Sequence, residues 1–514
     1  MPRWTQFFSS TPAAKLGVWH NWCHSESVQP QRIAQPTSAR DLIQRVAMAT
    51  EQGQRIRMTG SGHAASDIAI TSEILLGPDL LNKPLTLDTS QLKQPIEAGL
   101  VRVQSGIKIA DLNRHLDQLG RALWNMGGYD QQTISGVMMT ATHGSGLDFG
   151  PMADQVVSLQ LVIDGGQMLQ IEPADGITDP ALWTGHLPED PSIAVELIQD
   201  DDAFHATRVA IGSMGILYAV VLRTDQKYWL REVRQLIKWS ALSRPDGYLD
   251  RIIRGLPVYT DRPVPAHWEL QYSPYPDAGG DYTFLITERH RSYSPLPEQP
   301  ASQRGARGTE LASTALVSIG QSVADLVQRI PAIAPRMLAQ ALQAQVCVSY
   351  SHVSYKVFNI GVVNDTPAVG IEAAFDLSQT IAAIERSFSL AQTLHDQGMP
   401  HTSPIAIRFV KKSSALIAMQ HGRDTMFMEV IAMGQKARSI DQLRRYQQVM
   451  LDEFGARPHW GLDFNLLTSA RAVAALYPDS WPRWLTQLRC FNPHGTFDGK
   501  VTDRLGISVA RKTA

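Results

Sequence analysis

The sequence has few of the features that would place a chain outside the cell, in a membrane or on nucleic acid. Its three cysteines, Cys23, Cys347 and Cys490, are widely separated, so neither a disulfide framework nor a cysteine metal site is expected. With 47 Lys and Arg against 49 Asp and Glu, the net charge of −2 gives no basis for binding nucleic acid. No apolar run is long enough to span a membrane, and residues 1–6 do not begin a signal peptide. These absences predict a reducing, cytoplasmic location.

The composition is that of a globular chain, because 44% of the residues are hydrophobic and 19% are charged. The length of 514 residues is enough for two or three domains. Apolar residues recur at helical spacing between Pro36 and Gly53, after Ser38 and Asp41 as candidate N-caps. A strand pattern at 101–106 precedes a helical pattern at 110–119. This alternation predicts an α+β fold.

A glycine turn is the most informative stretch of the first half. The alternating basic and apolar residues Arg55-Ile56-Arg57-Met58 indicate a short strand, and Met58-Thr59-Gly60-Ser61-Gly62-His63-Ala64 overlaps its end. Two glycines without Cβ atoms allow a ligand close to the backbone, and successive N–H groups in such a turn form a concave site suited to a pyrophosphate. His63 offers an imidazole nitrogen beside that site. Taken alone, the stretch is equally compatible with a polar loop that carries a surface histidine.

Two further glycine-rich stretches follow. The second stretch spans Met126–Gly146, and its candidate ligand-binding residues are Gly127, Gly128, Thr133, Gly136, Val137, Met138, Met139, Thr142, His143 and Gly144. Small and hydroxyl residues at this density suit a backbone that wraps a planar or phosphorylated ligand. The third stretch contains Gly212, Gly215 and Ile216 and leads into an apolar strand pattern. Between the two, a strand pattern at 156–163 ends in a Gly-Gly hairpin turn.

The three stretches in this order resemble the vanillyl-alcohol-oxidase type (PCMH-type) of FAD flavoprotein, and within it the gulonolactone, arabinonolactone and alditol oxidases. The second half agrees through the motifs Ser354-Tyr355-Lys356, Ile371-Glu372-Ala373, Pro458-His459-Trp460-Gly461 and Asn492-Pro493. Several motifs in a fixed order are more specific than any single glycine loop. The resemblance covers most of residues 25–505.

This resemblance implies a two-subdomain FAD-binding domain over residues 1–225 and an α+β cap domain with an antiparallel sheet over 226–455. Residues 456–514 would return to the flavin and bring His459 to it. The implied cofactor is FAD, attached through His63 to the flavin's 8α carbon or held there by a non-covalent contact, and no metal is expected. A helical insertion at about 308–345 would act as a lid, contact a membrane surface peripherally or pack on the cap.

The resemblance also places the catalytic groups, and here the chain departs from the group. A Glu is expected two residues before Arg408, but that position is Ala406. A Lys is expected after His-Trp-Gly, but that position is Leu462. Arg408 is retained, and the candidates for the base that takes the hydroxyl proton are, in declining order, His459, Glu269 and Glu372.

Loss of two charged groups favours a substrate bulkier or more apolar than an alditol, because a polyol would leave buried hydroxyls unpaired. Gly127 lies where a dehydrogenase relative has an alanine that blocks oxygen, so the prediction is an oxidase of an alcohol that uses O2 and releases hydrogen peroxide. Two alternatives stay open. The first is a sugar-acid lactone or alditol oxidase, or a dehydrogenase with a quinone or cytochrome acceptor. The second is a flavin-binding protein with altered or lost turnover. No motif indicates an oligomeric state.

Overall fold

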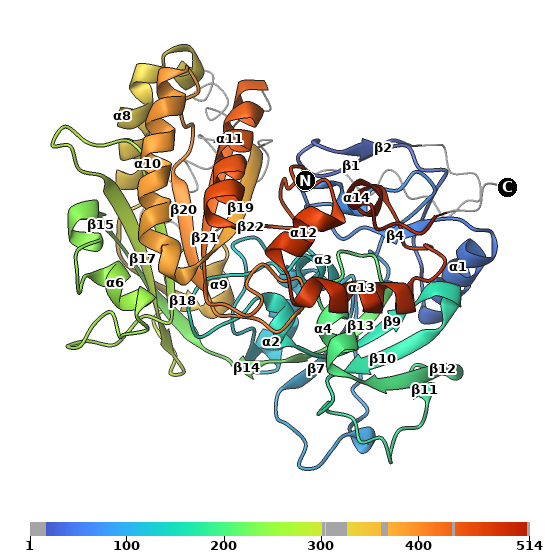
Figure 1. Ribbon diagram of the computed structural model, residues 1–514. Helices are drawn as coiled ribbons and strands as arrows, with labels where there is room; N and C mark the ends of the chain where they lie inside the picture. The colour runs from blue at the N-terminus through green and yellow to red at the C-terminus, as the bar shows by residue number, and fades with distance from the viewer. Residues whose placement is uncertain (1–16, 301–303, 305–325, 361–367, 434–436, 511–514) are drawn as a thin grey trace.

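Two bodies lie side by side in the molecule, each built around its own sheets (Figure 1). The computed structural model describes residues 17–300, 304, 326–360, 368–433 and 437–510. The first body contains a three-stranded parallel sheet of β3 (Arg32–Ala34), β5 (Ile74–Leu76) and β4 (Ile56–Met58). Its larger sheet has the order β11 (His186–Leu187), β12 (Asp190–Gln199), β10 (Met168–Glu172), β9 (Val156–Val162), β13 (Ile216–Arg223), β7 (Leu100–Gln104) and β6 (Pro84–Leu85).

The second body is organised on one eight-stranded antiparallel sheet. Its order is β18 (Cys347–Val353), β15 (Trp229–Lys238), β17 (Thr283–Ser292), β16 (His267–Tyr272), β20 (Ile405–Val410), β21 (Thr425–Met433), β19 (Ala368–Asp376) and β22 (Arg457–Pro458). Short two-stranded pairs complete the strands: β1 (Trp19–His20) with β2 (Ser27–Val28), and β8 (Arg121–Ala122) with β14 (Asp225–Gln226). The predicted α+β class and the antiparallel sheet of the cap are confirmed.

The predicted helices of the first body form where apolar spacing and capping residues coincide. Helix α1 (Ala39–Glu51) begins after Ser38, whose side chain accepts a hydrogen bond from the Asp41 N–H, and it buries Leu42 and Val46. Helix α2 (Ile109–Gln118) has no side-chain cap, but it too buries its apolar face, through Leu112 and Leu116. The second glycine stretch is not all loop, because it contains α3 (Ile134–Met139) with Thr133 as its N-cap. Helix α4 (Asp201–Thr207) completes this body.

The sheet of the second body has two different faces because side chains alternate along its strands. Apolar residues such as Leu270, Ile407 and Met428 fill one face, in a core shared with the helices that cover it. These helices are α5 (Trp239–Leu242), α6 (Tyr248–Ile253), α10 (Thr380–Asp396) and α11 (Ala437–Phe454). The opposite face carries polar and charged side chains, among them Glu269 and Arg408, and it forms one wall of a cavity.

Helices α12 (Ala470–Leu476), α13 (Ser480–Phe491) and α14 (Lys500–Leu505) return the chain to the first body, where α13 packs beside α4 (Figure 1). The indole N–H of Trp484 donates to the Val209 carbonyl at 3.1 Å. The Arg504 guanidinium pairs with Asp67 at 2.8 Å. The domain limits 1–225, 226–455 and 456–514 stay predictions, but the end of the chain does pack against its beginning.

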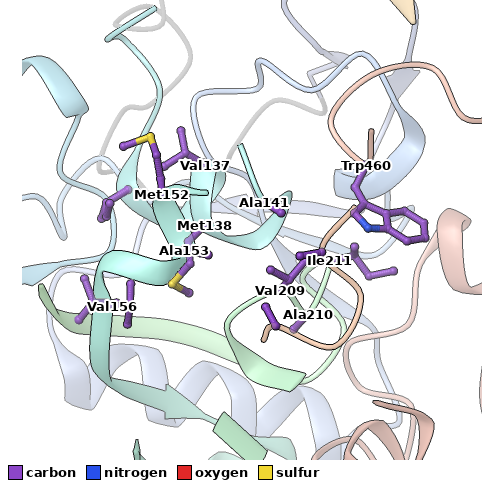
Figure 2. Packing of buried hydrophobic residues seen from close by; sticks show 14 of the residues in the cluster. Val137, Met138, Ala141, Met152, Ala153, Val156, Val209, Ala210, Ile211 and Trp460 are labelled. Atoms are coloured by element: carbon purple, nitrogen blue, oxygen red, sulfur yellow. The ribbon is translucent and has the colours of Figure 1, made fainter. Parts of the chain in front are cut away.

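One hydrophobic cluster joins the segments that carry the glycine motifs. Val137 and Met138 of α3, the residues 209–211 before the third glycine turn and Trp460 of the His-Trp-Gly motif all belong to it (Figure 2). Figure 2 shows Trp460 close to the 209–211 segment, opposite α3. Apolar packing therefore fixes the second and third stretches and the C-terminal motif relative to one another.

Part of the predicted insertion at 308–345 can be placed. Helix α8 (Ala334–Gln343) follows Pro331, and its Ala334 and Leu338 pack with Tyr275 and with Ala391 of α10. Residues 305–325 lie outside the described residues. The described part of the insertion thus packs on the cap, and none of the described helices is both long and apolar enough to cross a membrane. The remaining helix of the second body is α9 (Ser354–Phe358).

Candidate active site

All three glycine stretches open onto one cavity of about 740 Å³ between the two bodies. Its lining includes the predicted residues Met58 to Ala64, Gly127, Gly128, Thr133, Gly136, Met139, Thr142, His143, Gly144, Gly212, Gly215 and Ile216, and also Glu269, Glu372, Arg408 and His459. Two predicted cofactor residues do not reach it. Val137 and Met138 lie on the side of α3 that packs into the core, where they are 1% and 0% exposed. Their side chains therefore do not line the cavity, and their assignment to the cofactor stays a prediction.

The first two glycine stretches are in direct backbone contact, as a cradle for a large ligand requires. A Cβ at Gly60 would lie 2.8 Å from Thr133 Oγ1 and 3.3 Å from Gly136 Cα, so only glycine fits there. Gly62 has φ +69°, a conformation that glycine adopts without strain. These features, in a cavity of this size, fit the phosphate and ring system of an FAD.

Arg57 of β4 braces the cradle from behind. Its guanidinium donates to the Phe497 and Ile211 carbonyls, both at 2.7 Å, and to the Ile68 carbonyl. Burial lowers the pKa of Arg57 to about 10. One buried side chain thereby ties together the first glycine turn, the third glycine turn and the C-terminal segment.

His63 lies between two aromatic rings at the cavity wall. Its ring centroid is 4.8 Å from that of Trp22 and 4.5 Å from that of Tyr129, with the Tyr129 ring stacked on it. Burial lowers the pKa of His63 to about 4, so the imidazole is neutral near pH 7 and keeps a lone pair on one nitrogen. Trp19 and Trp22, close to the start of the described chain, also line the cavity.

Arg408 of β20 is the centre of a buried charged cluster on the opposite wall. Its Nη1 donates to Glu429 Oε2 at 3.0 Å and to Glu372 Oε1 at 3.4 Å, and its Nη2 donates to Glu269 Oε1 at 3.4 Å. Three carboxylates outweigh burial and raise the pKa of Arg408. The guanidinium therefore stays charged at any working pH.

The three carboxylates differ in basicity. Burial alone would raise the pKa of each, but Arg408 and Arg289 lower the pKa of Glu269, and His143, His459 and Arg408 lower that of Glu372 to about 2. The pKa of Glu429 is raised, because burial and the nearby Glu372 charge together outweigh its pairing with Arg408. Of the three carboxylates, Glu429 is therefore the one whose pKa lies above its ordinary value.

Glu429 also explains the missing family residue. Ala406 of β20 pairs across the sheet with Glu429 of β21, and Glu429 pairs in turn with Glu372 of β19. Side chains directly opposite each other lie on one face with Cβ atoms about 4.5–5.5 Å apart. A carboxylate expected at 406 is thus present one strand away, and its only sequence signal is a lone charge within the apolar run of residues 425–433.

Two histidines flank Glu372. His143 Nδ1 donates to the Gly144 carbonyl at 2.9 Å and His143 Nε2 lies 3.2 Å from Glu372 Oε2, so both ring nitrogens face acceptors. His459 Nδ1 accepts from the Gly461 N–H at 2.9 Å. One ligand atom from each of His143, Glu372 and His459 lies within 4.8 Å of the others, a spacing that a metal ion can occupy. The hydrogen bonds described above already give each of these three side chains a partner, so their arrangement does not require a metal ion.

The fold and cavity define an FAD-dependent oxidoreductase of the vanillyl-alcohol-oxidase type. Residues 30–172 match the FAD binding domain family, and residues 283–505 match the D-arabinono-1,4-lactone oxidase family. The chain is therefore similar in both halves to the group of gulonolactone and arabinonolactone oxidases that the sequence motifs predicted.

Individual relatives agree over nearly the whole chain. An L-gulono-1,4-lactone dehydrogenase of Mycobacterium tuberculosis is 27% identical over 489 residues, which cover 95% of this chain and 99% of that one. L-gulonolactone oxidase of Mus musculus is 23% identical over 452 residues, which cover 87% of this chain and 89% of the mouse protein. The crystal structure of cholesterol oxidase from B. sterolicum superimposes with a TM-score of 0.71, covers 95% of this chain and 96% of its own, and at 13% identity shows the shared fold alone.

Proposed function

We propose that this protein oxidises a CH–OH group of a small polyhydroxylated compound of the sugar-lactone or alditol class. The observation that carries the proposal is the polar face of the cap sheet, where Glu269, Gln271, Arg408 and Glu429 line the cavity. Hydroxyl groups of such a substrate would find partners there instead of being buried unpaired. The expectation of an apolar-biased pocket rested on Ala406 and Leu462 alone, and the neighbouring charges favour the lactone alternative.

Bound FAD supplies the hydride acceptor. The glycine cradle would hold the cofactor, and we assign its covalent attachment to His63, because a neutral imidazole keeps the lone pair that such a bond needs. The stacked Tyr129 ring and the tilted Trp22 ring hold the imidazole between them. When the C–H hydrogen of the substrate leaves as hydride, the hydroxyl proton must pass to a base on this chain.

Glu429 is the proposed base. A raised pKa makes a carboxylate more basic, and it keeps Glu429 closer to the working pH than Glu269 or Glu372. Arg408, 3.0 Å away, would polarise the substrate oxygen and stabilise the developing negative charge. The proton therefore moves from the hydroxyl to Glu429 Oε while the guanidinium stays charged.

The candidates taken from sequence fit the role of base less well. His459 uses Nδ1 to accept from the Gly461 N–H, and burial lowers its pKa to about 4, so its neutral ring carries a proton on Nε2. That nitrogen is a donor and suits binding of the substrate oxygen. Glu372 and Glu269 have lowered pKa values and are held by His143 and by arginines, which suits positioning.

We propose O2 as the electron acceptor, and a dehydrogenase with another acceptor is the second candidate. Gly127 lines the cavity without a side chain, and a methyl group there would reach 3.4 Å from Thr142 Cγ2. The second candidate is favoured by the M. tuberculosis relative, which is named a dehydrogenase.

The proposed function is tested by anaerobic mixing of the holoprotein with L-gulono-1,4-lactone, D-arabinono-1,4-lactone, xylitol and benzyl alcohol. Loss of the oxidised-flavin absorbance with at least one polyhydroxylated compound, faster than with benzyl alcohol, is the expected result. The mixing is repeated with L-gulonate and xylitol 5-phosphate, and no bleaching with any of the polyhydroxylated compounds, or faster bleaching with benzyl alcohol, would reject the proposal. Admission of air then separates the acceptors, because an oxidase recovers its absorbance rapidly and forms hydrogen peroxide.

A further inference from the structure

Three arginines on the cavity wall share one carboxylate that lies behind them. Glu232 of β15 accepts from Arg289 Nε at 2.8 Å and from Arg304 Nε at 2.9 Å, and it pairs with Arg234 Nη2 at 2.9 Å. Arg234, Arg289 and Arg304, here named the arginine cluster, line the cavity, whereas Glu232 does not. Positive groups therefore face the ligand space.

The charge of the arginine cluster is not balanced within the described residues. Glu232 is 0% exposed and the three arginines are at most 7% exposed. Glu269 accepts a hydrogen bond from Arg289 at 3.3 Å, but it also accepts one from Arg408 at 3.4 Å. Buried charges normally have partners of opposite sign, so three guanidinium groups that have one carboxylate and a share of a second can accept a further anion.

Arg234 makes fewer polar contacts than Arg289 or Arg304. Within the part of the chain that the structure describes it has a single ion pair, to Glu232, and it lines the cavity. Burial lowers the pKa of Arg234 against the opposing effect of Glu232, as an under-compensated guanidinium requires. A guanidinium presents donors in a planar fork that matches a carboxylate or phosphate.

One member of the cluster, Arg234, lies far from Arg408 along the sheet, whereas Arg289 shares the Glu269 carboxylate with Arg408. Arg234 pairs with Thr287, Thr287 with Glu269, and Glu269 with Arg408, so three strand spacings lie between the two arginines. At about 4.8 Å per spacing their Cα atoms are about 14 Å apart. On this face of the sheet, Arg234 therefore lies towards one edge, and Glu372 and Glu429 lie towards the other edge.

We propose that the substrate carries a carboxylate or phosphate group that binds at the arginine cluster, while its reacting CH–OH group lies beside Arg408 and Glu429. This proposal rests on the proposed function and narrows its substrate class from neutral lactones and alditols to sugar acids or sugar phosphates. Arg234 then selects the substrate by its charge.

Binding without turnover provides the test. The holoenzyme, with its flavin reduced by dithionite, is titrated calorimetrically with L-gulonate, xylitol 5-phosphate, L-gulono-1,4-lactone and xylitol. We expect at least one anionic compound to bind about 10- to 100-fold more tightly than its neutral counterpart, the effect of hydrogen bonds to a charged group. The tighter of the two anions identifies the group as carboxylate or phosphate.

Two variants locate the effect. Arg234→Met should remove most of this preference, and it leaves Glu232 with two arginine partners, so the fold should persist. Arg231→Met is the matched control, because Arg231 lies three residues away on the exposed side of the same strand. Its preference should equal that of the wild type.

The outcomes separate this inference from the proposed function. Equal binding of anionic and neutral compounds by the wild type, or an unchanged preference in Arg234→Met, overturns the anion subsite, even if a neutral lactone reduces the flavin. Tight, Arg234-dependent binding of an anion supports the subsite even if none of the compounds reduces the flavin, in which case the proposed function alone fails.

Discussion

Glu429→Ala is the substitution that probes the reacting end of the cavity most directly. Glu429 is 3.0 Å from Arg408 and has a raised pKa, so it is the proposed acceptor of the hydroxyl proton. Removal of the carboxylate leaves Arg408 with Glu269 and Glu372, and a buried guanidinium with two remaining partners should not unfold the cap. The variant should therefore bind FAD as the wild type does.

The size of the kinetic effect follows from the role of a general base. Such a group contributes about 10²- to 10⁴-fold to a proton-transfer step, which corresponds to about 2.7 to 5.4 kcal/mol of activation free energy. The rate constant for anaerobic flavin reduction at saturating substrate should fall by that factor. Stopped-flow absorbance measures this rate without interference from the oxygen reaction.

Relocation of the carboxylate gives the decisive control. Ala406 lies opposite Glu429 on the neighbouring strand, with Cβ atoms about 4.5–5.5 Å apart, so a longer side chain at 406 can reach the same space. The double variant Ala406→Glu with Glu429→Ala should recover at least about tenfold of the lost rate, whereas Ala406→Gln with Glu429→Ala should not. A Glu429→Ala enzyme with an undiminished reduction rate would refute the assignment of the base.

Four further outcomes follow from the same contacts. His63→Ala should release flavin from acid-precipitated protein, whereas wild-type protein should stay yellow and fluorescent; complete release from the wild type contradicts covalent attachment. Gly127→Ala places a methyl group at ordinary contact distance, so it should slow reoxidation in air and leave anaerobic reduction unchanged. Arg408→Lys should slow flavin reduction by about 10²-fold or more, because a single ammonium cannot serve three carboxylates, and an unchanged rate would make Arg408 only structural. For Glu429→Gln, the raised pKa means that wild-type stability from this group is present at low pH and lost as pH rises through that pKa, so the variant should gain stability relative to wild type as pH rises above the ordinary range of a carboxyl group, measured by urea unfolding.

Contiguous motifs account for what could be predicted from the sequence. The turn at Gly60–His63 forms its cradle from adjacent residues, and Arg408 and His459 lie within short motifs, so position along the chain was enough to assign them to the cavity. Helix α1 was also predictable, because its Ser38 cap and its apolar spacing are local features. The competing interpretation of His63 as a surface residue is excluded by its place between two aromatic rings.

Features that depend on packing could not be predicted in this way. Val137 and Met138 belong to a glycine-rich motif, yet a helix of six residues turns them into the core, and so short a helix leaves little periodic signal. Glu429 stands beside Ala406 only because β20 and β21 pair in one register. A shift of one residue would turn Glu429 to the opposite face, so its role depends on the pairing of two separate strands.

The pairing of β20 with β21 also explains why the chain can have alanine at 406, where a glutamate is expected, and still have a charged site. A sheet face offers equivalent positions on neighbouring strands, and a side chain as long as glutamate reaches the same point from either of them. Ala406 therefore does not mark an apolar pocket, because Gln271 on one neighbouring strand and Glu429 on the other flank it in the same row. The same reasoning applies to Arg234, which lies in no recognised motif. Cross-strand pairing places it in one row with Glu269 and Arg408, so it contributes positive charge to one end of the cavity wall. The selectivity of such a site depends on side chains that lie opposite one another on neighbouring strands. The ligand that fits this arrangement is a substrate with an anionic group at one end and a hydroxyl group at the other.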